Sequence, residues 1–351
     1  MGVTETPPIR ARRVLLRRSA FVFAALLVVG LVIFALLRLD LHQIGHTLIT
    51  ATPGWIVLAL ALMAMSLLLR SVSWHQTLRA ALPETPMPWP PVVRALMIGV
   101  MASAVFPGRI GEPLRILVLS RRLDGSTRRQ LPIVTGTVFS QTLINLLALG
   151  ILLAVTFSSV PLLQGHLSGL ESALAPPLAL CLLVLGGPRA LALARRSRSA
   201  RVAGAADTVA RLLSLARQGL VVFARPRYGA TAIVSQLLAW ALQWLSCYAV
   251  MLALGLQSDG GPVAAAAILL AVNLSAILPA TPSNVGVFQA ACVVVLAAYG
   301  VSAGSGVAYG IILQAVEMIT ALGLGVPALL GEGLRWQDIR ATGASAREGA
   351  E

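Results

Sequence analysis

The sequence predicts an all-α, polytopic integral membrane protein. Hydrophobic residues make up 57% of the 351 positions and charged residues only 11%, and the mean hydropathy is +0.85. Soluble domains are about one quarter charged, so water is not the main solvent of this chain. The apolar residues also fall in long blocks, and about 20 residues of helix are needed to cross a hydrocarbon core of ~30 Å. We therefore expect the blocks to be membrane spans.

We expect six of these blocks to be full spans: Ala20–Leu37, Gly54–Leu69, Leu131–Phe157, Ala173–Ala194, Tyr228–Leu256 and Val307–Leu330. Together with the segments between them they predict one transmembrane domain over residues 19–334. A basic segment, 1–18, precedes this domain, and a polar tail, 335–351, follows it. No soluble domain of useful size is expected.

The distribution of arginine predicts the orientation of the chain. Basic residues gather in 1–18, 121–129, 189–227 and 335–351, and loops rich in Arg or Lys stay in the cytoplasm. We expect both termini to be cytoplasmic in a bacterial inner membrane. The net charge of +14 would indicate nucleic acid in a soluble protein, but here topology explains it, so no nucleic-acid partner is predicted.

A first broken segment lies between the second and third of these spans. Val92–Ser120 has Arg at both ends, and Pro107, Gly108 and Gly111 interrupt its middle. Each arm has only about 10 to 15 residues, too few for a span, and proline and glycine break helices. The pattern predicts a re-entrant hairpin that enters from the cytoplasm.

A second broken segment, Val263–Tyr299, is interrupted at Pro282 and Gly286, and the loops at its ends contain no Arg. It is either a hairpin entering from the opposite side or two short spans. Both breaks share the spacing Pro-x-x-x-Gly. Broken helices in matching places of two halves are typical of inverted-repeat transporters, in which freed backbone groups line a cavity. Chance is the alternative, because proline and glycine are common in membrane helices.

Charged and amide side chains at membrane depth are the candidate binding residues. Ionisable groups are costly there and usually line a cavity or have a partner. Arg109 and Glu112 lie at the first break, followed by Arg115. The arginines could hold an anionic lipid headgroup, helped by a half-helix N-terminus. Alternatively, Arg109 and Glu112 form a structural pair across the turn.

Glu317 lies inside the last span, one turn after Gln314. Its carboxyl could couple to protons or bind a headgroup, or it could simply be a hydrogen-bonded buried acid. Arg70 and Trp74 follow the second apolar block. We interpret these two residues as snorkelling and interfacial anchoring at the end of that span.

Motifs for catalysis are missing from the sequence. It has no His/Cys/carboxylate metal cluster, no Gly-rich phosphate loop and no Gly-x-Ser-x-Gly elbow. We therefore expect no metal, no cofactor and no enzymatic activity.

Three motifs carry a family resemblance: RSVSW at 70–74, FPGRIGEPLR at 106–115 and PATPSNVGVFQ at 279–289. They resemble the lysylphosphatidylglycerol synthetase transmembrane-region family over roughly residues 15–335. The best-known members flip aminoacylated phosphatidylglycerol across the inner membrane. Many relatives have Glu where this chain has Gln289. The synthetases also carry a soluble acyltransferase domain after the membrane part, so this chain is expected to be a stand-alone member that does not make aminoacyl lipid.

The resemblance implies a flippase-like protein that moves or binds an anionic or polyprenyl-phosphate-linked lipid. The residues expected around its cavity are Arg109, Glu112, Arg115, Asn284, Gln289, Gln314 and Glu317. Its partners would be membrane lipids with anionic headgroups, together with a second copy of the chain or a membrane enzyme. One alternative is a non-transporting accessory subunit of a membrane glycosyltransferase or lipid-modifying enzyme, and a weaker one is an enzyme acting on a lipid-linked sugar.

Overall fold

The fold is a bundle of α-helices in a computed structural model, which describes residues 51–106, 110–122, 127–159, 221–275 and 284–332. Four long helices in these ranges are apolar enough to cross a membrane: α3 (Pro53–Ala81), α6 (Thr127–Ser159), α10 (Pro226–Ala253) and α13 (Ala303–Gly331). They coincide with four of the six predicted spans. The other two, Ala20–Leu37 and Ala173–Ala194, lie outside the described residues, as do both termini.

The first broken segment is a helical hairpin. Helix α4 (Trp89–Val105) ends before the break, and α5 (Gly111–Ser120) folds back to pack against it. A Cβ atom on Gly111 would lie 2.0 Å from the carbonyl oxygen of Gly99, so only glycine permits this close approach. Pro107 and Gly108 lie outside the described residues.

The second broken segment also consists of two short helices, α11 (Gly261–Ser275) and α12 (Val287–Ala297), which pack against each other. The backbone enters α12 through two residues with positive φ, Asn284 at 54° and Gly286 at 88°. Glycine adopts such angles readily and asparagine more readily than most residues. Pro282 lies outside the described residues.

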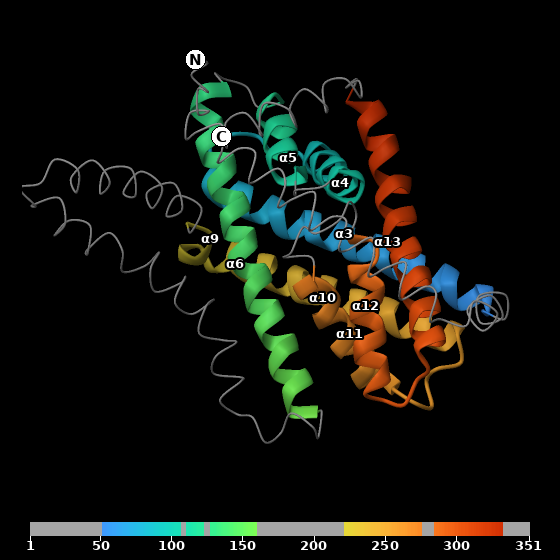
Figure 1. Cartoon of the computed structure of the whole chain (residues 1–351). Helices are drawn as coiled ribbons and strands as arrows, with labels where there is room; N and C mark the ends of the chain where they lie inside the picture. The colour runs from blue at the N-terminus through green and yellow to red at the C-terminus, as the bar shows by residue number, and fades with distance from the viewer. Residues whose placement is uncertain (1–50, 107–109, 123–126, 160–220, 276–283, 333–351) are drawn as a thin grey trace, which may run out of the picture.

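Helices α3 and α10 form an antiparallel pair through the middle of the molecule (Figure 1). Three buried serine hydroxyls cross this interface and donate to backbone carbonyls: Ser66 to Ala239 (2.8 Å), Ser73 to Ala232 (2.9 Å) and Ser246 to Ala59 (2.9 Å). Along each helix the positions are seven residues apart (59, 66, 73 and 232, 239, 246). Small residues with interhelical hydrogen bonds allow close packing where no hydrophobic effect drives helices together.

The register of this pair shows an inverted repeat. Proline begins both helices, at 53 and 226, a shift of 226 − 53 = 173 positions. Ser73 and Ser246 are also 173 positions apart, and so are their acceptors Ala232 and Ala59, so these two hydrogen bonds are equivalent in the two halves. Ser66 and Ala239 are themselves 173 positions apart, so the bond between them joins equivalent positions. A pseudo-two-fold axis therefore passes near Ser66. The halves are α3 to α6 and α10 to α13, each a long helix, a hairpin and a long helix.

Helices α6 and α13 lie on opposite sides of the central pair, with the two hairpins towards opposite ends (Figure 1). Helix α13 packs against α4 of the first hairpin and α12 of the second. Glycines make both contacts close: Gly325 lies against Met101, and Gly310 lies against Gln289. One helix thus touches both hairpins.

Glu332 caps the end of α13 and binds the two arms of the first hairpin. It accepts from Arg94 Nε of α4 (2.6 Å) and from Arg122 Nε just after α5 (2.7 Å), and its side chain is only 4% exposed. This triad is not apparent in the sequence, because Glu332 lies more than 200 positions from both arginines (332 − 122 = 210).

Candidate intramembrane binding site

Among the described cations of the first hairpin, Arg115 is the most enclosed, with 7% of its surface exposed. Its Nη2 pairs with Glu112 one turn earlier on α5, and its Nη1 donates to Gln141 Oε1 of α6 at 2.8 Å. The guanidinium lies 4.9 Å from the ring centre of Trp74, in reach of a cation–π interaction. Its Nε is buried and has no hydrogen-bond partner in the described part of the chain.

Gln141 connects the first hairpin to the central pair. An amide side chain both accepts and donates, and here Oε1 accepts from Arg115 while Nε2 donates to the backbone carbonyl of Arg70 at 3.1 Å. Trp74 is held on the same side, because its Nε1 donates to Thr137 Oγ1 at 3.2 Å. The ring beneath Arg115 is therefore fixed by α6.

Arg70 lies near the middle of the 29-residue helix α3, so the interpretation as an anchor at the end of a span is wrong. The apolar block stops at Leu69, but the helix continues to Ala81. Its guanidinium donates through Nη2 to Gln243 of α10 and lies 5.8 Å from the ring centre of Trp240. Partners on another helix, rather than the membrane interface, therefore stabilise the positive charge. The Nε atom of Arg70 is buried and has no hydrogen-bond partner among the described residues.

A further amide fixes the ring beside Arg70. Asn145 Oδ1 of α6 accepts from Gln236 Nε2 and from Trp240 Nε1, each at 2.9 Å. Sequence reasoning missed Gln141, Asn145, Gln236 and Gln243. The available signal was the presence of amide side chains inside apolar spans, where each needs a partner because no water replaces it.

The second hairpin has a corresponding but uncharged contact. Gln289 Nε2 of α12 donates to Gln314 Oε1 of α13 at 2.6 Å, and Gln289 Oε1 accepts from the backbone N–H of Gly286 at 2.7 Å. The repeat shift carries Gln141 onto Gln314 (141 + 173 = 314). Each half therefore places a glutamine of its last long helix against the second arm of its hairpin.

Glu317 lies one turn after Gln314, in the middle of α13, and is half-buried. Within the described residues, its carboxyl has no hydrogen bond or ion pair. It is nevertheless close enough to Arg70 for the two charges to interact across the interface between α13 and α3.

The structure brings the predicted residues together in two groups. Glu112 and Arg115 form one, and Gln289 and Gln314 form the other, beside Asn284 and with Glu317 one turn away. Arg109 lies outside the described residues, so the predicted pair between Arg109 and Glu112 stays a prediction. Gly111 and Gly286 lie at the starts of α5 and α12, as expected for helix breaks.

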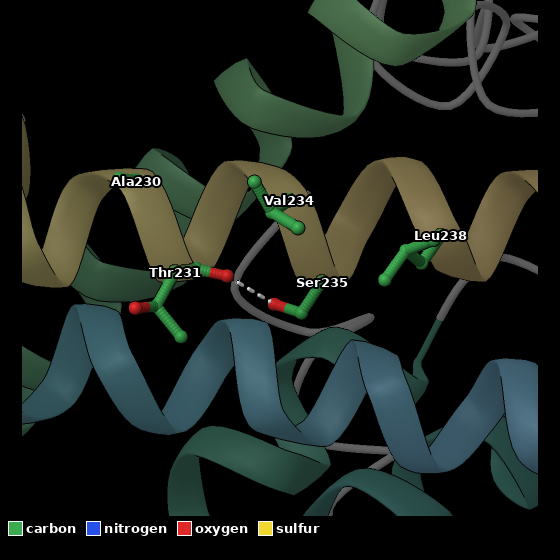
Figure 2. A pocket seen from close by; sticks show the side chains of 5 residues that line it. All are labelled: Ala230, Thr231, Val234, Ser235 and Leu238. Atoms are coloured by element: carbon green, nitrogen blue, oxygen red, sulfur yellow. Dashed lines mark hydrogen bonds between the residues drawn. The ribbon is translucent and has the colours of Figure 1, made fainter.

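No cluster of three or more His, Cys, Asp or Glu that could hold a metal ion occurs in the described ranges. A separate shallow groove lies beside α10 (Figure 2), lined by Ala230, Thr231, Val234, Ser235 and Leu238. Its hydroxyls donate to carbonyls of α10 itself, Thr231 to Arg227 and Ser235 to Thr231. The groove thus offers apolar surface rather than a charged site.

The fold and the polar centre define a multi-pass membrane protein with two inverted hairpins around arginine and amide side chains. The family model of the lysylphosphatidylglycerol synthase TM region matches residues 21–325, and the chain belongs to this family. The family is associated with a lipid flippase-like membrane function, as the resemblance of the three motifs implied. No curated protein matches the chain.

Proposed function

We propose that the protein binds the phosphate of an anionic lipid at Arg115 and carries the lipid across a bacterial inner membrane, without covalent chemistry. The observation that supports this most is the buried Arg115 guanidinium, which has an unpaired Nε and lies on the ring of Trp74. A charge at membrane depth costs upwards of about 2.5 kcal/mol and usually marks a ligand or ion path.

The chemistry of Arg115 suits a phosphate. A guanidinium offers a planar fork of N–H donors that matches phosphate oxygens, while stacking on an aromatic ring leaves the donors free at the edge. Its one described counter-ion, Glu112, is 52% exposed and can turn away to solvent. The hairpin supports the same role, because α5 begins at the break and its N-terminal N–H groups favour an anion.

The lipid class follows from this chemistry and from the family. Phosphatidylglycerol and polyprenyl phosphates both present a phosphate on an apolar chain, so both are candidate substrates. The arginine-rich segments favour a cytoplasmic position for both chain termini and for residues 121–129. The first hairpin would then receive lipid from the cytoplasmic leaflet.

Proteoliposomes can test the proposal. Acyl-labelled fluorescent phosphatidylglycerol is distributed over both leaflets, and dithionite added outside destroys the label only in the outer leaflet. We expect wild-type protein to make nearly all of the label accessible. Arg115→Gln should slow this at least tenfold, and Arg115→Lys should slow it less, because it keeps the charge but loses the fork.

Arg121→Gln is the matched control, since Arg121 is an exposed arginine just after α5. It should behave as wild type. A second set of vesicles with a labelled polyprenyl phosphate separates the two lipid sources. Wild-type protein that moves neither lipid would contradict transport and favour an accessory role beside a membrane enzyme.

A further inference from the structure

We propose that Arg70 and Glu317 couple lipid movement to a proton. The lipid phosphate and the Glu317 carboxylate bind the Arg70 guanidinium in turn, and Glu317 takes a proton from water whenever the phosphate holds Arg70. This inference rests on the proposed function and names the ion that accompanies the lipid.

The two groups are placed for such an exchange. Each lies near the middle of a long helix, Arg70 on α3 and Glu317 on α13, and the two helices pack together. Their charges interact, yet no ion pair within 4.0 Å joins them in the described residues. Both also have unused capacity: Arg70 Nε has no hydrogen-bond partner among these residues, and the Glu317 carboxyl likewise has none. Each of the two groups can therefore bind a further hydrogen-bonding partner.

The inverted repeat places Arg70 at the crossing point between the halves. The shift of 173 positions carries Arg70 onto Gln243, and these two residues are hydrogen-bonded to each other, as expected beside a pseudo-two-fold axis. Arg115 lies near enough on the side of the first hairpin to repel the Arg70 charge. A phosphate leaving Arg115 for the second half therefore meets Arg70 next.

Charge balance supplies the coupling. An uncompensated charge in an apolar interior is far more costly than a paired one. While no lipid is bound, the Glu317 carboxylate offsets the charge of Arg70 across the interface between α3 and α13, without a direct ion pair. When a phosphate takes its place, the carboxylate is left without a cation in the middle of the apolar helix α13. Protonation then removes its charge at the lowest free-energy cost. One proton then moves with each lipid.

Other titratable groups around Glu317 do not provide the same response. Arg70 of α3 acts on Glu317, and Glu317 in turn acts on Cys247 (α10), Cys292 (α12) and Tyr309 of α13 itself. Thiols, phenols and guanidinium groups ordinarily keep their protons at neutral pH. The ionisable residue of α4, Arg94, is bound to Glu332 at the end of α13. In the described part of the chain, Glu317 is thus the group expected to gain a proton when a phosphate binds Arg70.

The test measures phosphatidylglycerol movement against pH, with the same pH on both sides of the vesicle. Because the lipid-bound state holds the extra proton, lower pH favours it. We expect wild-type protein at sub-saturating lipid to be several-fold faster at about pH 6 than at about pH 8, with a limit of about tenfold per pH unit for one linked proton. Glu317→Gln should abolish this dependence, whereas Glu317→Asp should retain it at a lower rate.

Glu84→Gln is the control, since it makes the same chemical change at an exposed acid, and it should keep the wild-type pH profile. When phosphatidylglycerol is instead added to the outer leaflet only, its net inward movement should carry protons, so a pH dye inside the vesicles should report proton entry with wild-type protein and none with Glu317→Gln. If Glu317→Gln keeps the wild-type pH profile, the coupling is refuted while transport stands. Wild-type protein that moves no phosphatidylglycerol or polyprenyl phosphate at any pH would refute the proposed function instead.

Discussion

The two halves of the molecule share a framework but differ in charge. In the first half, the contact between hairpin and long helix joins Arg115 to Gln141, with Glu112 on the outer side. In the second half, the corresponding contact joins two neutral amides, Gln289 and Gln314. The repeat therefore determines where the polar side chains lie, but only the first half has charged residues at these positions. Under the proposed function, an anionic headgroup would bind in the first half and pass through the second.

The largest expected effect concerns the glycines at the two breaks. Gly111→Ala places a Cβ atom against the backbone of Gly99, which cannot move aside as a side chain can, and should destabilise the protein by about 3 kcal/mol or more. Gly286→Ala must instead adopt a φ of 88°, a strain of about 1–2 kcal/mol. Thermal unfolding in detergent measures both. Equal losses would show that the two hairpins are held together in the same way.

The serines of the central pair test the repeat itself. Ser73→Ala and Ser246→Ala each remove one hydrogen bond to a carbonyl of the opposite helix, and each should cost about 1 kcal/mol. Because the pseudo-two-fold axis exchanges these bonds, the two losses should agree to within about 0.5 kcal/mol, the usual limit for independent sites. Clearly unequal losses, measured by unfolding under the same conditions, would mean that the halves have different packing at equivalent positions.

The smallest expected effect is the coupling between Glu112 and Arg115. The carboxylate is half exposed, so solvent screens the pair and a double-mutant cycle of Glu112→Gln and Arg115→Gln should give a coupling below about 1 kcal/mol. In the same variants, Glu112→Gln should retain lipid movement, whereas Arg115→Gln should lose it. A coupling of several kcal/mol, with transport lost equally in both single variants, would assign Arg115 to a structural pair.

The sequence predicted the hairpins better than it predicted the polar centre. Short arms and proline and glycine breaks are local features, and they identified α4, α5, α11 and α12. The role of Arg70 depends on Gln243, which lies 173 positions away in the chain. An apolar block that stops at Leu69 looks like the end of a span unless the partner helix is known. The same holds for Gln141, whose two partners come from α3 and α5.

The clamp of Glu332 on Arg94 and Arg122 joins both arms of the first hairpin to one end of α13. Farther along, the same helix packs on α12 through Gly310. An α-helix resists stretching. A displacement of the first hairpin along the axis of α13 is therefore transmitted through this helix to the second hairpin. The two hairpins are therefore mechanically connected, and a movement of one is expected to shift the other.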